Sequence, residues 1–427
     1  MYKLSYIFIL TVVFAISSCD LNRVEDEVLL RTDRFTSDSP ANVERWVFIS
    51  NQNGKLLDVV KPDATSGVIE FKGVASNYIM LTELIVISFE NGSETQLRHN
   101  ITTYMGIPVG NSYFLSDEKT NRPPHPDPIG KATITLNNYQ GSDDPWLSVG
   151  FSDGYKGYNS WLDYDTHTYD GSTFMADMNL KEDPIDIFIT SYDGTEPVYS
   201  WVLDAGVGDS VVVDYESFSP MIPVTINKPV TNAYIQGQLE PGIGGRGYFL
   251  SWSEYWRNSN HYGEGEIISL GYTDEFPYYN VYAETGQILC CQPHEGVRYQ
   301  KVGTSVPQTI HLPDYIFSLD NEKLFNLDYS FDQQYTYKKF SFSEEQNNNS
   351  LRWIFYTPEG VEIKVPHIPV EILSQYPYLY RNNIPLQYVT FNEYLDGYTY
   401  LDYIKNRLEI RSLDRPEFEQ FRYYFQF

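Results

Sequence analysis

Residues 46–60 read WVFISNQNGKLLDVV, in which two β-rich runs flank the dipeptide Asn53-Gly54. Asn-Gly or Asp-Gly between such runs supplies the positive φ angles that a tight hairpin turn needs. The same arrangement recurs at Asn91-Gly92, Asp193-Gly194 and, with Glu-Gly, at Glu359-Gly360. Runs 132–136 and 361–365 alternate apolar with polar residues, as strands with one buried face do. These patterns predict a mainly β chain of tandem antiparallel β-sandwich domains, Ig-like or transthyretin-like.

Aromatic abundance supports the same fold class. Of the 427 residues, 37 are Tyr, 24 Phe and 7 Trp, and aromatic residues are typical of strands. Helix is predicted only in short pieces near the end of the chain. Residues 369–375 have proline in the first turn, and residues 401–408 form a second short helical run.

A proline-rich stretch, RPPHPDP at 122–128, marks the clearest break in the chain, because proline fixes φ and removes a backbone donor. We therefore expect an N-terminal β-sandwich domain at 44–120, a linker at 121–129, a second β domain at 130–228, and a C-terminal β domain with short helices at 229–427.

Two internal echoes accompany these domains. The pattern P-x-T-I-x-x-P occurs at 223–229 and 307–313, and Arg-Trp-aliphatic-Phe occurs at 45–48 and 352–355. Both patterns fit either repeated sandwich units or chance similarity between strands.

The first 18 residues have one basic residue, an apolar stretch and then small residues, which is the pattern of a secretory signal. Ile16-Ser17-Ser18-Cys19 resembles the lipobox of exported bacterial lipoproteins of the Bacteroidota type. That resemblance implies cleavage before Cys19, acylation of this cysteine, and attachment to the outer membrane. Residues 19–43 are polar and are predicted to be an acidic tether, and Glu25-Asp26-Glu27 is similar to a surface-export signal.

The formal net charge is −27, which disfavours nucleic acid and anionic lipid headgroups as partners. Besides Cys19, the chain has only the adjacent Cys290 and Cys291, for which two thiols are expected because a bond between neighbours is strained. No cofactor is expected. The G-x-G-x-x-G at 242–247 precedes a predicted strand or aromatic loop, whereas a dinucleotide site requires a helix there.

The loop around residues 163–171 is the one weak calcium candidate, with Asp163, Asp165 and Asp170 as oxygen ligands. It lacks the glycine and glutamate positions of an EF-hand, and an acidic, solvated hairpin loop is the favoured interpretation. The seven histidines have no zinc-protease spacing, and no nucleophile elbow is present.

The densest aromatic patch surrounds the sequence WSEYW at 252–256. Packing within a sandwich is the favoured interpretation of these rings, and stacking on sugars is the functional alternative. The candidate ligand-binding residues are Trp252, Tyr255, Trp256 and Tyr262. We therefore expect a lipid-anchored, non-catalytic binding or structural module, displayed on the cell surface, with a glycan or protein partner. The alternative is an exported hydrolase whose paired carboxylates cannot be identified from sequence.

Overall fold

The computed structural model describes residues 28–31 and, from residue 42 to residue 427, most of the chain. The segments outside the description are 63–67, 73, 75, 92–93, 111, 115–125, 141–148, 156–163, 193–195, 243–245, 253–268, 287–294, 347, 381–383 and 411–414. The predicted signal peptide, Cys19, Cys290 and Cys291 therefore lie outside the described residues.

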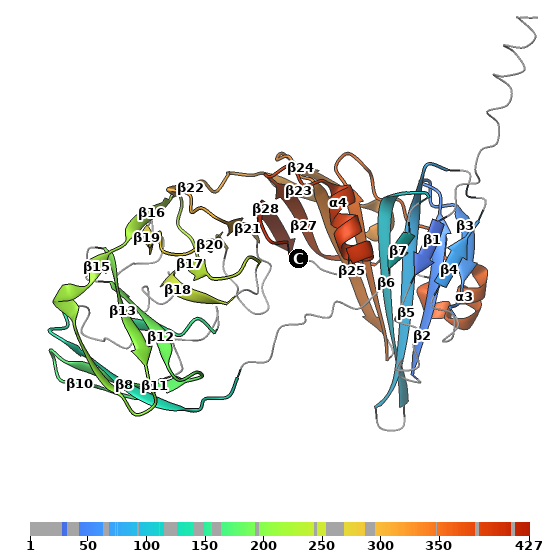
Figure 1. The fold of residues 1–427 in the computed structure, drawn as a ribbon. Helices are drawn as coiled ribbons and strands as arrows, with labels where there is room; N and C mark the ends of the chain where they lie inside the picture. The colour runs from blue at the N-terminus through green and yellow to red at the C-terminus, as the bar shows by residue number, and fades with distance from the viewer. Residues whose placement is uncertain are drawn as a thin grey trace, which may run out of the picture. The chain divides into compact units, whose positions relative to one another are not determined.

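The predicted mainly β fold is confirmed, since strands make up most of the elements of the described chain (Figure 1). The α-helices are short and lie where the sequence predicted them, at α3 (Val370–Gln375) and α4 (Tyr400–Lys405). Within the described residues, none of the helices has the length and apolar character needed to cross a bilayer.

The chain divides into two compact units. Unit 1 contains residues 1–118, 341–385 and 401–411, and unit 2 contains residues 119–340, 386–400 and 412–427. Both units thus take segments from the last third of the chain. The three-domain boundaries remain a prediction.

Unit 1 is built around a long hairpin. Its large sheet has the order β3 (Leu56–Val60), β2 (Val43–Ser50), β5 (Tyr78–Asn91), β6 (Glu94–Pro108) and β26 (Asn349–Pro358). The predicted hairpins at Asn53-Gly54 and Asn91-Gly92 are both present, as β2–β3 and β5–β6. Gly54 has a φ of +84°, which is the backbone conformation that the turn needs from glycine.

The Arg-Trp-aliphatic-Phe echo has a structural counterpart in this sheet. Trp46 on β2 pairs with Leu84, Leu84 pairs with Ile101, and Ile101 pairs with Trp353 on β26. The two copies therefore lie in register on opposite sides of the β5–β6 hairpin.

A smaller sheet in unit 1 has the order β4 (Val68–Phe71), β1 (Val28–Arg31) and β7 (Ser112–Phe114). Strand β1 lies inside the stretch predicted as a tether, so this part of the chain belongs to the folded unit. The strand predicted at residues 361–365 is wrong, because the chain after β26 has no strand there. Both edges of β26 are already occupied, by β6 and by β25 (Tyr337–Gln346).

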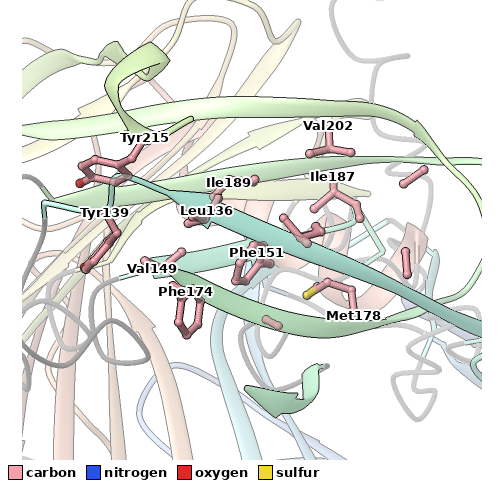
Figure 2. Packing of buried hydrophobic residues seen from close by; sticks show 14 of the residues in the cluster. Leu136, Tyr139, Val149, Phe151, Phe174, Met178, Ile187, Ile189, Val202 and Tyr215 are labelled. Carbon is pink, nitrogen blue, oxygen red and sulfur yellow. The ribbon is translucent and has the colours of Figure 1, made fainter. Parts of the chain in front are cut away.

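Unit 2 begins with a β-sandwich. One sheet has the order β10 (Tyr164–Tyr169), β11 (Phe174–Leu180), β8 (Gly130–Asn137) and β14 (Ser210–Asp214). The other has the order β15 (Ser219–Pro220), β13 (Pro197–Ala205), β12 (Ile185–Tyr192) and β9 (Val149–Ser152). The alternating run 132–136 is confirmed as part of β8, and Asp193-Gly194 lies between the paired strands β12 and β13. Figure 2 shows side chains of both sheets, including Phe174 and Ile187, packed in one buried core.

The second echo also places matching residues together. β16 (Ile222–Ile226) runs parallel to β22 (Thr309–Ile310), with Thr225 opposite Thr309 and Ile226 opposite Ile310. The third strand of this sheet is β19 (Ser269–Tyr272). The Asn227 side chain then bonds both backbone groups of Leu312, at 3.1 Å to the carbonyl and 2.8 Å from the amide.

Six further strands of unit 2 are consecutive hydrogen-bonded neighbours in one sheet. In order they are β18 (Gly247–Trp252), β17 (Asn232–Gln238), β20 (Tyr278–Glu284), β21 (Glu295–Gly303), β28 (Phe418–Gln426) and β27 (Leu386–Tyr394). One face of this sheet is apolar, with Val281, Val297 and Tyr423 fully or almost fully buried. Residues of the hairpin formed by β23 (Phe317–Asn321) and β24 (Asp328–Phe331) pack there, for example Phe331 against Phe391 at 4.0 Å.

Candidate functional site

The predicted aromatic site is represented by Trp252, the last residue of β18. Its half-buried ring packs against Phe249, and its indole N–H donates to Asn232 Oδ1 at 2.8 Å. Tyr255, Trp256 and Tyr262 lie outside the described residues, so the structure leaves their role as a prediction.

Two tyrosines complete the cluster around Trp252. Tyr234 on β17 and Tyr282 on β20 are register partners, and their rings stack in parallel with centroids 4.8 Å apart. Tyr234, Phe249 and Tyr282 are buried, whereas Trp252 is reached by solvent. Rings with an apolar face and a polar tip suit a ligand that is also partly apolar and partly polar.

Strand register extends this aromatic cluster into a polar surface, because residues directly opposite each other on neighbouring strands share one face of a sheet. Tyr234 is opposite Tyr282, Tyr282 is opposite Gln300, and Gln300 is opposite Gln420. The neighbouring row runs from Asn232 through Glu284, Arg298 and Arg422 to Asn392. We call this surface the polar face and define it by these two rows together with Trp252, Phe249, Gln236, Asn280, Tyr424 and Tyr394.

Hydrogen bonds hold the amides of the polar face in place. Asn280 Nδ2 donates to Gln236 Oε1 at 3.2 Å, and Gln300 Nε2 donates to Asn280 Oδ1 at 3.3 Å. Gln236 and Asn280 are almost completely buried, whereas Gln300 is half-buried. A buried, bonded amide row fixes the orientation of the more accessible groups beside it.

The carboxylate of this face, Glu284, is 2 % exposed and fully engaged. Arg298 Nη2 donates to Glu284 Oε1 at 2.9 Å, and the Tyr282 hydroxyl donates to Oε2. Burial alone would lower the pKa of Arg298, but the adjacent Tyr282 and Glu284 outweigh it and raise the pKa. Arg298 is therefore a permanent cation on this face.

Tyr424 closes the end of the face beside Glu284. Its hydroxyl donates to the Thr285 carbonyl at 2.6 Å, and its ring crosses Gly296 to reach it. A Cβ atom at Gly296 would lie 2.3 Å from that hydroxyl oxygen, so only glycine permits this approach. Burial, with the nearby Glu284 carboxylate, raises the pKa of Tyr424 and keeps the phenol neutral.

The other arginine of the face has a neutral partner. Arg422 Nε donates to Asn392 Oδ1 at 2.9 Å, and Asn392 Nδ2 in turn donates to Thr390 Oγ1 at 3.3 Å. Arg422 is half-buried, so solvent reaches its side chain. Trp252, Arg298, Gln300 and Arg422 thus form an accessible group above buried amides.

A second aromatic cluster in unit 2 differs in its polar tips. Trp201 Nε1 donates to Glu275 Oε2 at 2.8 Å, and the Tyr199 hydroxyl donates to Oε1 of the same carboxylate at 3.1 Å. Trp201 also packs edge-on against Phe188 and Tyr248. We assign this cluster a packing role between sheets of unit 2, because Glu275 satisfies both polar tips.

His99 is a titratable side chain of unit 1 whose exposed fraction is 0 %. Its Nδ1 lies 3.1 Å from the Ser350 carbonyl, and its Nε2 has no hydrogen-bond partner among the described residues. The ring stacks on Tyr378 and meets the edge of Tyr376. Burial lowers the pKa of His99, so the imidazole is neutral at pH 7.

The calcium candidate receives no support from the described part of the loop. Asp163 and the side chain of Asp165 lie outside the described residues. The Asp170 carboxylate accepts the backbone N–H groups of Ser172 and Thr173, at 3.1 and 2.8 Å, and so caps a hairpin turn. Where the structure describes the chain, no group of three or more His, Cys, Asp or Glu side chains could hold a metal ion.

Sequence reasoning located Trp252 but missed the remainder of the polar face. The sequence does contain a pattern that predicts such a face. In NAYIQGQ at 232–238 and YYNVYAE at 278–284, polar residues and tyrosines occupy every second position, as they do on one face of a strand. Their position on a common face depends on strand order, and β28, which contributes Gln420 and Arg422, lies about 140 residues further along the chain than β20.

Comparison with known proteins gives no family assignment, because neither a protein-family model nor a curated protein matches this chain.

Proposed function

We propose that this protein is a lipid-anchored, non-catalytic protein of the cell envelope that binds a saccharide through the polar face of unit 2. The observation that carries the proposal is the coexistence, on one sheet face, of the aromatic cluster around Trp252 with prearranged amides and arginines. The anchor rests on the lipobox resemblance at Cys19.

Saccharides combine apolar C–H faces with hydroxyl groups that both donate and accept hydrogen bonds. An aromatic ring stacks on the C–H faces, while amides and guanidinium groups form hydrogen bonds with the hydroxyl groups. The accessible Trp252, Gln300 and Arg422 provide these three groups on one surface. The buried row beneath them limits the side-chain entropy lost when a ligand binds.

The hydrolase alternative is less well supported by this surface. A glycosidase of the common type needs two carboxylates flanking the scissile bond. Among the residues that define the polar face, Glu284 is the one carboxylate, and it is paired with Arg298 and Tyr282. The geometry of this face therefore favours recognition without bond cleavage.

Binding is tested with the full-length protein on an array of bacterial, plant and host glycans, followed by calorimetry on any glycan retained. Trp252→Ala is expected to weaken binding by tenfold or more, because it removes the accessible ring. Trp201→Ala is the matched control, since that half-buried indole also donates to a side-chain oxygen at 2.8 Å. The proposal fails if no saccharide is bound, or if Trp201→Ala is as damaging as Trp252→Ala.

Anchoring is tested separately by cell fractionation and metabolic labelling with a palmitate analogue. The wild-type protein is expected in the membrane fraction and labelled, whereas Cys19→Ala is expected to be unlabelled and released from the membrane. Protease treatment of intact cells then tests surface display. An intact protein that is cleaved only after lysis would contradict display on the outer leaflet.

A further inference from the structure

The centre of the polar face brings two positive charges together. Arg298 on β21 and Arg422 on β28 are register partners. The Cα atoms of such partners lie about 4.5–5.5 Å apart, and like charges opposite each other destabilise a sheet. Placing two arginines there has a cost in stability unless another group offsets their repulsion.

The carboxylate of this face offsets only one of these charges. Glu284 bonds Arg298 at 2.9 Å, whereas the side-chain partner of Arg422 is the neutral amide of Asn392. No ion pair joins Arg422 to a carboxylate in the described part of the chain. The defined polar face therefore carries a net charge of +1, from two arginines and one glutamate, within a protein of net charge −27.

A buried amide beside Arg422 is also unused. Gln420, two residues before Arg422 on β28 and on the same face, is only 6 % exposed. Its side chain has no hydrogen-bond partner among the described residues, and its amide atoms are not among the fully enclosed polar atoms that lack a partner, so a ligand can reach them. Its register neighbours on this face are Gln300 and Tyr394. An unpaired guanidinium charge and an unpaired amide thus lie side by side.

We propose that Arg422 and Gln420 bind the anionic substituent of an acidic saccharide, with Arg298 adding to the positive potential. This inference rests on the proposed function and specifies its ligand class. The shared ligand chemistry is an oxyanion on a sugar, either a uronate carboxylate or a sulfate ester. A guanidinium group binds such oxyanions in a two-pronged geometry, and the amide N–H₂ of Gln420 supplies a further donor.

The test uses ligand pairs that differ only in charge, measured by calorimetry at physiological ionic strength with the full-length protein. Polygalacturonate oligosaccharides are compared with their methyl esters, and dextran sulfate is compared with dextran. We expect at least one charged member to bind at least tenfold more tightly than its neutral counterpart. Preference for the uronate or for the sulfate identifies the source of the oxyanion.

Substitutions assign the effect to the site. Arg422→Gln is expected to abolish the preference for the charged ligand, while Arg422→Lys, which keeps the charge, retains part of it. Arg352→Gln is the matched control, because it removes one positive charge at an exposed position of unit 1. Thermal denaturation of each variant shows whether the fold is retained.

Two results separate the inference from the function on which it rests. If charged and neutral ligands bind equally and Arg422→Gln changes neither, the anionic class is wrong while saccharide binding stands. If none of these ligands and no arrayed glycan binds, the proposed function fails and the inference fails with it.

Discussion

Protonation of His99 is expected to link the stability of unit 1 to pH. The Ser350 carbonyl can only accept, so Nδ1 carries the proton in the neutral ring, and Nε2 is buried without a hydrogen-bond partner among the described residues. A proton added to Nε2 would be buried without an acceptor, which is why burial lowers the pKa of His99 from 6.5. The unfolded chain has no such constraint.

The sign follows from proton linkage. Below pH 6.5 the unfolded state binds a proton at His99 that the folded state does not, so stability falls as pH falls. One proton corresponds to about 1.4 kcal/mol per pH unit. Lowering the pH from 7.5 to 5.5 therefore reduces the free energy of unfolding by up to about 1.4 kcal/mol through His99. This upper limit is reached when the pKa of His99 in the folded state lies well below 5.5.

Urea denaturation at pH 7.5 and 5.5 measures this effect. His99→Phe is expected to lower stability by a constant amount through the lost bond to Ser350, and to reduce the loss between the two pH values by up to about 1.4 kcal/mol. His367→Phe, at an exposed position of unit 1, is the control. Equal pH-dependent losses in the wild type and His99→Phe would refute this account.

Three further predictions concern unit 2. In Gly237→Ala the new Cβ would lie 2.2 Å from the Phe276 ring, so overpacking is expected to lower the free energy of unfolding by about 1–3 kcal/mol. Thermal denaturation should show partial recovery in the Gly237→Ala/Phe276→Leu double variant, and an unchanged Tm in Gly237→Ala would contradict the close packing. Asn227→Ala removes both side-chain hydrogen bonds to Leu312 and is expected to lower the free energy of unfolding, measured by urea denaturation, by about 1–3 kcal/mol. Thr225→Ala, at an exposed position of β16, should lower it by less. Glu284→Gln leaves Arg298 without its carboxylate and is expected to destabilise the protein, by no more than about 1–3 kcal/mol because Arg298 is partly solvated. A stabilised variant would show that the ion pair lowers the stability of the wild-type protein.

Local sequence signals predicted local structure well in this chain. Turn dipeptides at Asn53-Gly54, Asn91-Gly92 and Asp193-Gly194 identified three hairpins, because the turn and its flanking strands are contiguous. Glu359-Gly360 carried a similar pattern, yet the following segment forms no strand. Its neighbour β26 already has partners on both edges, and that occupancy depends on β6, about 250 residues earlier.

The polar face illustrates the same limit on the functional side. Trp252 was identifiable because its aromatic neighbours are close in sequence. Arg298 and Arg422 become neighbours only through the register of β21 with β28, which no local pattern specifies. The repeated pattern at 223–229 and 307–313 corresponds to a direct contact in the fold, because its central residues are paired on neighbouring strands.

The division of the chain between its two units has a consequence for how the protein reaches its folded state. Unit 1 requires residues 341–385 and 401–411, so its sheet lacks strand β26 until most of the chain has been synthesised. Contacts of such long sequence separation form slowly, and they leave strand edges exposed in the meantime. If the chain is exported as the lipobox predicts, this late closure keeps it in the unfolded form that a secretion channel accepts. It also means that truncation at the end of the apparent N-terminal domain would remove strand β26, the neighbour of β6, and expose the edge of β6.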